Sequence, residues 1–150
     1  MLRERFNETL KEAMKAKDDL TVSTVRLILA RLKEKDIEAR PKLDRIDDAA
    51  IQQMLQQMIK QRRESIELYE KGKRPELAAK EKGEIAVIER FLPKQMTGVE
   101  LESAVKDTIR ETGAAGVKDM GKVMAALRTK YAGRIDPAAA SQTVKKLLTG

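Results

Sequence analysis

Apolar residues recur along the chain every three or four positions, which is the spacing of one face of an α-helix. No stretch alternates apolar and polar residues as a half-buried strand does. The apolar positions of the first two helices are Leu2, Phe6, Leu10 and Met14, then Val22, Val25, Leu29 and Leu32. The pattern predicts an all-α fold.

Capping residues set the expected limits of the next two helices. Asp47 is a good N-cap for a third helix, and Ile46 and Ile51 flank it as a hydrophobic staple. Gly72 ends that helix, and Pro75 suits the first position of a fourth.

The stretch FLPKQMTG, residues 91–98, is the predicted domain boundary, because Pro93 stops the fourth helix and Thr97 and Glu100 form a capping box. Three further helices follow: one ends at Gly113, one starts after Asp119 and one starts after Asp136. We expect an N-terminal four-helix-like part over residues 1–92, a hinge over 93–97, and a small three-helix tail domain over 98–150.

Composition narrows the possible chemistry. The 150 residues include no cysteine and no histidine, which excludes disulfides, cysteine- or histidine-ligated zinc, and imidazole catalysis. No apolar run approaches the ~20 residues of a membrane span, and the start of the chain lacks the apolar segment of a signal peptide. We expect a cytoplasmic protein without cofactor or metal. The net charge of +7 favours polyanionic partners, with nucleic acid first.

Residues 116–123, GVKDMGKV, fall one residue short of a nucleotide-binding P-loop. A P-loop needs a strand before the glycine-rich turn and a hydroxyl after the lysine. A helix is expected before Gly116, and Val123 has no hydroxyl. Nucleotide hydrolysis is therefore not expected here.

The helix after Asp119 has two different faces. Its core stripe is Met120, Val123, Met124, Leu127 and Tyr131. The other face carries Lys118, Lys122 and Thr129, flanked by Gly121 and Ala125. A glycine inside a helix costs about 1 kcal/mol relative to alanine, so either tight packing or the close approach of a polyanion is expected at Gly121. Packing is the commoner reason.

Five basic residues gather in this region against one acid, Asp119. They are Lys118, Lys122, Arg128, Lys130 and Arg134. Aromatic residues are nearly absent, so we expect recognition of the backbone and shape of a folded nucleic acid rather than base stacking. Lys71, Lys73 and Arg74, at a predicted hairpin tip, offer a second and weaker anion contact.

Charged residues also interrupt apolar stripes. Glu81, Arg62 and Arg26 each stand among core positions of their helices, and a buried charge is costly unless it is paired. We expect Glu81 to pair with Arg62 or Arg26, and Glu84 to be solvated. A general acid with a raised pKa is the functional alternative for Glu81.

Two segments carry a family resemblance. Residues 118–124 (KDMGKVM) and 133–148 (GRIDPAAASQTVKKLL) resemble the helical tail of the GatB subunit of tRNA-dependent amidotransferase. Residues 59–96 resemble the stand-alone YqeY-like family, which shares that tail. The resemblance covers essentially the whole chain. It implies a helical part joined to a three-helix tail that, in GatB, binds tRNA while catalysis occurs elsewhere.

The main hypothesis is a non-catalytic adaptor that binds tRNA or another structured RNA and acts alongside an amidotransferase or another tRNA-handling enzyme. One alternative is a protein-interaction module without RNA affinity, docking a partner helix on the Gly121 and Ala125 face. A more distant alternative is carbon–nitrogen ligase activity, with glutamine as amido donor, as part of a complex. The sequence offers no catalytic residue for it.

Overall fold

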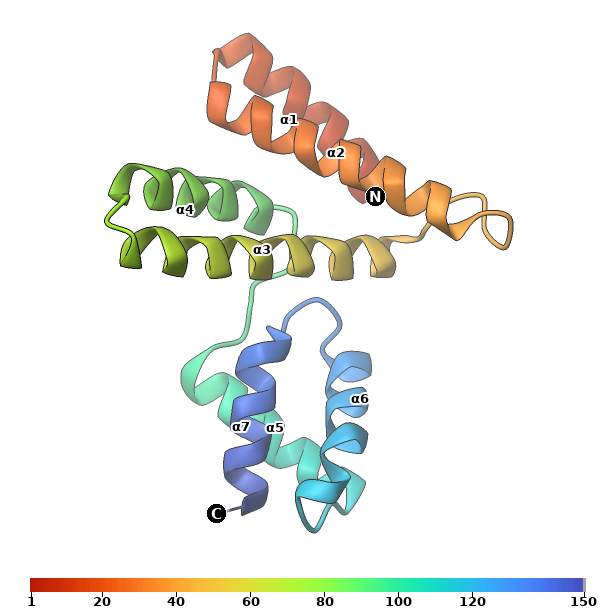
Figure 1. Ribbon diagram of the computed structural model, residues 1–150. Coiled ribbons are helices and arrows are strands. Elements are labelled where there is room, and N and C mark those ends of the chain that lie inside the picture. Colours follow the sequence, from red (N-terminus) through yellow and green to blue (C-terminus); the bar gives the residue numbers. More distant parts are fainter. Residues whose placement is uncertain (150) are drawn as a thin grey trace. The chain divides into compact units, whose positions relative to one another are not determined.

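The computed structural model describes residues 1–149 and contains helices but no strand within them (Figure 1). The all-α prediction is confirmed. The chain divides into two compact units, one of residues 1–92 and one that begins at Pro93. Residue 150, the predicted end of the tail domain, lies outside the described residues.

The N-terminal unit consists of two helical hairpins, α1 with α2 and α3 with α4 (Figure 1). Asp18 and Asp47 each cap the helix that follows, accepting a backbone N–H three residues on. The cap predicted at Asp47 is confirmed, as are the helix end at Gly72 and the helix start at Pro75. The four helices are α1 (Leu2–Ala16), α2 (Asp19–Ala39), α3 (Asp48–Lys71) and α4 (Pro75–Glu89).

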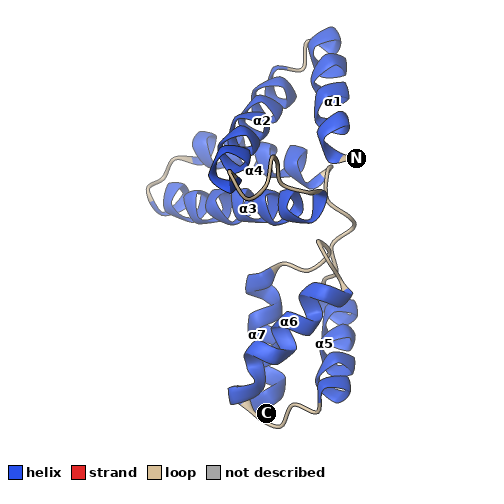
Figure 2. Cartoon of the chain, turned by 90° about the vertical axis from the view of Figure 1, so that its right-hand side faces the viewer, coloured by secondary structure: helices blue, strands red, loops and turns tan. Residues whose placement is uncertain are grey.

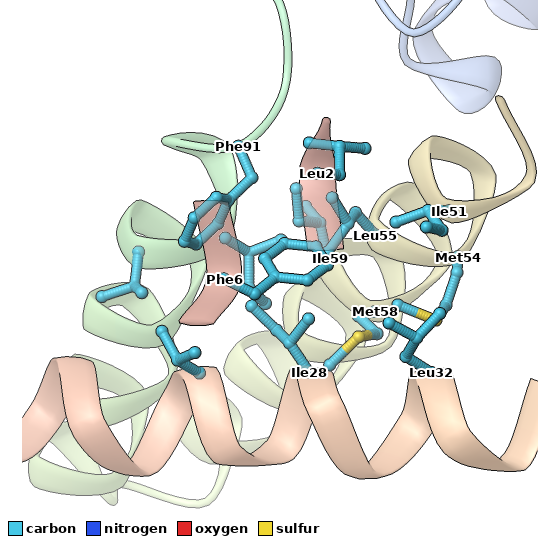
Figure 3. Packing of buried hydrophobic residues seen from close by; sticks show 13 residues of the cluster. Leu2, Phe6, Ile28, Leu32, Ile51, Met54, Leu55, Met58, Ile59 and Phe91 are labelled. Atoms are coloured by element: carbon cyan, nitrogen blue, oxygen red, sulfur yellow. The ribbon is translucent and has the colours of Figure 1, made fainter. Parts of the chain in front are cut away.

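All four helices contribute to the core of this unit (Figure 3). Phe6 of α1 is completely buried and meets Phe91 edge to face, with ring centroids 4.8 Å apart and planes at 76°. Arg5 lies over the Phe91 ring at 5.5 Å and donates a 2.8 Å hydrogen bond to the Arg90 carbonyl. The end of α4 is thereby tied to the start of the chain.

A half-buried ion pair joins three segments of the same unit. Arg3 of α1 makes two hydrogen bonds to Asp36 of α2, at 2.8 and 2.9 Å. The Ile46 N–H donates to Asp36, and the Ile46 carbonyl accepts from Arg3. The Arg3 hydrogen bond, together with the Ile46 N–H, lowers the pKa of Asp36 from 3.8 to about 2.

This pair makes the stability of the unit depend on pH. Asp36 has a lower pKa when folded than when unfolded, so its contribution is complete above about pH 4 and is lost as pH falls through about 2. We expect Asp36→Asn to lower the free energy of unfolding by about 1–2 kcal/mol at pH 7, after allowance for screening by water. Urea unfolding at pH 7 and pH 2 should show this difference disappear in acid. The control Glu34→Gln, in an exposed pair with Arg31, should stay within about 0.5 kcal/mol of wild type at both pH values.

The C-terminal unit has its own core among α5, α6 and α7 (Figure 2). Its elements are α5 (Gly98–Thr112), the 3-10 helix η1 (Val117–Asp119), α6 (Met120–Lys130) and α7 (Pro137–Thr149). The predicted end of a helix at Gly113 is confirmed, with φ +67°. The capping box is wrong in one respect: α5 follows Thr97, but the Thr97 side chain makes no cap hydrogen bond.

The segment 93–97, marked as a hinge by the sequence, is bound within the C-terminal unit. Met96 is buried in its core and donates a 2.7 Å backbone hydrogen bond to the carbonyl of Arg134. The Gln95 amide donates to the carbonyl of Gly133. None of the helices in residues 1–149 is both long and apolar enough to span a membrane.

Candidate nucleic-acid interface

Helix α6 buries one face and leaves the other open. Val123 and Leu127 are fully buried, and Met120, Met124 and Tyr131 pack beside them, so the predicted core stripe is confirmed. Gly121, Lys122, Ala125, Arg128 and Thr129 are all exposed. With about 100° of rotation per residue, Gly121, Ala125 and Thr129 form the middle of the open face. Lys122 lies at one edge and Arg128 at the other. We call this surface, together with the exposed Lys118 of the adjoining η1, the open face of α6.

Gly121 has no packing partner among the described residues of its own unit. Apart from its chain neighbours and the backbone of its own helix, a Cβ built there would meet no atom within 4 Å, so the packing explanation that the sequence favoured finds no contact within the C-terminal unit. Neither does a left-handed backbone require glycine at this position. The remaining explanation from the sequence is the close approach of an external group.

The five basic residues predicted to form a binding surface fall into two groups. Lys118, Lys122 and Arg128 are exposed and make no ion pair within residues 1–149. Lys130 donates a 2.8 Å hydrogen bond to Glu111 of α5, and this hydrogen bond raises the pKa of Lys130. The Lys130 ammonium also lies over the Tyr131 ring. The open face therefore carries three cations that form no ion pair among the described residues, with Asp119 as the acid beside them.

Arg134 is held as firmly as Lys130. It donates to Glu100 of α5 at 2.9 Å and to the Lys94 carbonyl at 3.1 Å. Glu100, predicted to belong to a capping box, is instead the ion-pair partner of Arg134. Both ion pairs lie on the surface, where such pairs contribute little to stability.

The acid beside the open face is occupied by backbone hydrogen bonds. Asp119 precedes α6 as predicted, but its side chain makes no hydrogen bond to the start of that helix. Instead it accepts the N–H of Ala115 at 3.0 Å. Backbone hydrogen bonds from Ala115 and Gly116 and the charges of Lys118 and Lys122 lower its pKa, so it is ionised at neutral pH. Its carboxylate fixes the turn before η1.

No described strand precedes the lysine of the P-loop-like stretch, and α5 and η1 come before it. The prediction that this near-match is not a P-loop agrees with the fold. The stretch contributes Lys118, Lys122 and the side-chain-free Gly121 to the open face.

Sequence reasoning missed two lysines at the end of the same unit. The last turns of α7, with Lys145 and Lys146, come to the end of the unit where η1 lies, and α7 contacts η1 (Figures 1 and 2). Both lysines are exposed. The adjacent pair of lysines near the end of a predicted helix was the available signal. It adds positive charge at the end of the unit where α6 begins.

A partly buried ionic cluster in the N-terminal unit was predicted in part. The Nε of Arg62 on α3 lies 2.9 Å from Glu84 and 3.9 Å from Glu81 on α4. Glu84, expected to be solvated, is only 6 % exposed, so that prediction is wrong. Arg26, the other expected partner, is exposed. Burial and the neighbouring Glu84 carboxylate raise the pKa of Glu81.

This cluster is best explained as a structural link between α3 and α4. Arg62 also donates to the Met58 carbonyl at 3.2 Å, which fixes the guanidinium against its own helix. Within residues 1–149 no three His, Cys, Asp or Glu side chains are grouped as metal ligands would be. The carboxylates face their arginine.

Comparison with known proteins gives a family match and several relatives. The family model described as "Yqey-like protein" matches residues 3–148. A protein of Lachancea thermotolerans, named altered inheritance of mitochondria protein 41, mitochondrial, is 37 % identical over 101 residues, covering 67 % of this chain and 53 % of the relative. Proteins of the same name from Vanderwaltozyma polyspora and Saccharomyces cerevisiae are 32 % and 33 % identical. Their matches cover 77 % and 62 % of this chain, and 64 % and 49 % of the relatives. The matched part is thus only about half to two thirds of each relative's length.

Proposed function

The chain belongs to the Yqey-like protein family, and on that premise we propose that it is a non-catalytic adaptor that binds tRNA or another structured RNA through its C-terminal unit. The observation that carries the proposal is the open face of α6. It combines three cations without ion pairs and a glycine whose Cβ position is empty.

The physical fit is to a phosphate backbone. Lys118, Lys122 and Arg128 supply point charges and a guanidinium for phosphate oxygens. Gly121 and Ala125 between them let a bulky backbone approach the helix. The two tyrosines of the chain are not on this face, so stacking of unpaired bases plays no part in the proposal. Lys130 and Arg134 would contribute only by exchanging their carboxylate partners for phosphate.

Association with an amidotransferase or another tRNA-handling enzyme is the second part of the proposal, and its support is the resemblance of residues 118–124 and 133–148 to the GatB tail. The cytoplasmic location remains a prediction, because the three relatives carry mitochondrial names.

The test is fluorescence anisotropy of labelled tRNA against a plain RNA duplex at two salt concentrations. We expect saturable tRNA binding that weakens steeply with salt. Lys118/Lys122/Arg128→Ala should bind about thirtyfold more weakly at low salt and lower the salt slope by about 3, because each phosphate contact releases about one counterion. The matched variant Lys11/Lys33/Lys42→Ala removes three exposed cations without ion pairs from the N-terminal unit and should remain within about threefold of wild type.

Two outcomes would count against RNA binding. One is the absence of binding by wild-type protein at low salt. The other is an equal loss in both triple variants, which would show only a dependence on net charge. If the open face docks a partner helix instead, Gly121→Leu should disrupt partner binding more than Lys122→Ala, and salt should have little effect.

A further inference from the structure

The two hairpins of the N-terminal unit turn through the same backbone pattern. In each, a lysine just beyond the first helix adopts a left-handed conformation with φ 57°, where glycine is the usual residue. Its N–H and the next N–H bond back to carbonyls of the helix's last turn. The bonds are Lys17 to Met14 and Asp18 to Ala13 in one hairpin, and Lys73 to Glu70 and Arg74 to Tyr69 in the other.

The residue after the lysine differs between the two tips. Asp18 accepts hydrogen bonds from the backbone and side chain of Thr21, so it caps α2. Arg74 holds the same place before α4 and makes no side-chain cap. A cation at this position also faces the partial positive charge of the helix start. The α3–α4 tip therefore has two adjacent residues, Lys73 and Arg74, that are both unfavourable for local stability.

Glu76 in the first turn of α4 offsets part of this cost, but no neighbouring acid in the described part of the chain pairs with Lys73 or Arg74. Glu67 pairs with Lys71 at 3.4 Å, and Glu70 pairs with Lys82 at 3.0 Å. Lys73 and Arg74 are exposed and form no ion pair within residues 1–149. The turn at residues 72–75 also lacks a large apolar side chain of the kind that enters a membrane surface.

We propose that the α3–α4 hairpin tip is a second phosphate-binding point, at which Lys73 and Arg74 contact the backbone of a structured RNA. The inference rests on the proposed RNA binding and extends it to the N-terminal unit. Locally unfavourable residues concentrate where function requires them. Here both are cations, and together they present two adjacent charges at an exposed turn.

The test uses the opposite effects of one substitution on stability and on affinity. Lys73→Gly/Arg74→Ser relieves the left-handed lysine and supplies a capping hydroxyl, so we expect the thermal midpoint of the N-terminal unit to rise by about 5 °C. The same variant should bind tRNA about tenfold more weakly at low salt and lower the salt slope by about 2. Lys73→Gln/Arg74→Gln should lose the same affinity without the gain in stability.

The matched control is Lys17→Gly, which relieves the same conformation at the α1–α2 tip. It should raise the midpoint and leave tRNA affinity within about twofold. Unchanged tRNA affinity in both double variants would overturn the proposal, as would an equal loss in Lys17→Gly.

Two further outcomes separate this proposal from the one it rests on. If wild type binds tRNA and only the open-face variant weakens, the tip proposal fails and the proposed function stands. If wild type binds no RNA, both fail. Binding to phosphatidylserine vesicles that the double variants abolish, with tRNA affinity unchanged, would assign the tip to membranes and overturn the RNA contact.

Discussion

Replacing Arg62 by leucine is expected to destabilise the N-terminal unit by about 3 kcal/mol at pH 7, because it leaves two carboxylates inside the protein without their counter-charge. The side chains of Arg62, Glu84 and Glu81 are 13 %, 9 % and 21 % exposed. The measurement is urea unfolding, monitored by the fluorescence of Tyr69 on α3. In a Tyr131→Phe background Tyr69 is the remaining tyrosine, and it reports on this unit alone.

Two companion measurements identify the cause. Adding Glu84→Leu to Arg62→Leu should recover more than half of the lost free energy of unfolding. Glu84 is the more buried of the two carboxylates left without a counter-charge, and the second substitution replaces it by an apolar group. The deficit of Arg62→Leu should also shrink as pH falls from 7 to 5. The pKa of Glu81 is already raised in the folded protein, so proton uptake there favours the folded state. A loss below about 1 kcal/mol at pH 7 would show that water reaches the cluster and compensates.

The largest effect on stability is expected from Phe6→Ala, at about 4 kcal/mol. Phe6 has no exposed surface, and its ring meets Phe91 edge to face, so the substitution removes apolar burial, opens a cavity and breaks an aromatic pair. Urea unfolding in the same single-tyrosine background measures it.

The control for this substitution keeps most of the volume. Phe6→Leu should cost only about 1.5 kcal/mol, because leucine fills much of the site. Equal losses in the two variants would assign the effect to the aromatic contact, and a small loss in both would show that the core closes around the gap.

The sequence predicted the helices well because their signals are local. Caps such as Asp47 and Pro75 act within one turn, and the period of apolar residues in α3 and α6 follows from helix geometry alone. Helix α4 was predicted less well. It packs against both α2 and α3, so its buried surface is broader than one stripe and includes Ala78, Glu84 and Val87. Glu81, expected among the core positions, keeps a side chain that is 21 % exposed, whereas Glu84, expected to be solvated, lies on the buried surface.

The candidate interface shows the same limit. Glycine followed by lysine at the start of α6 was visible in the sequence, and so was the cluster of cations. Which cations are neutralised was not visible, because Lys130 meets an acid 19 residues away and Arg134 meets one 34 residues away. Those pairings depend on how α5 lies against α6 in the folded unit. The empty space above Gly121 likewise depends on where the other helices are.

The two hydrophobic cores do not share residues. The first cluster ends at Leu92 and the second begins at Met96. In evolutionary terms, a recombination breakpoint in the three codons between them would keep all residues of one core on one gene fragment and all residues of the other core on the other fragment. Either fragment can then be joined to an unrelated gene with its interior intact, which makes this stretch the natural point for the exchange of modules.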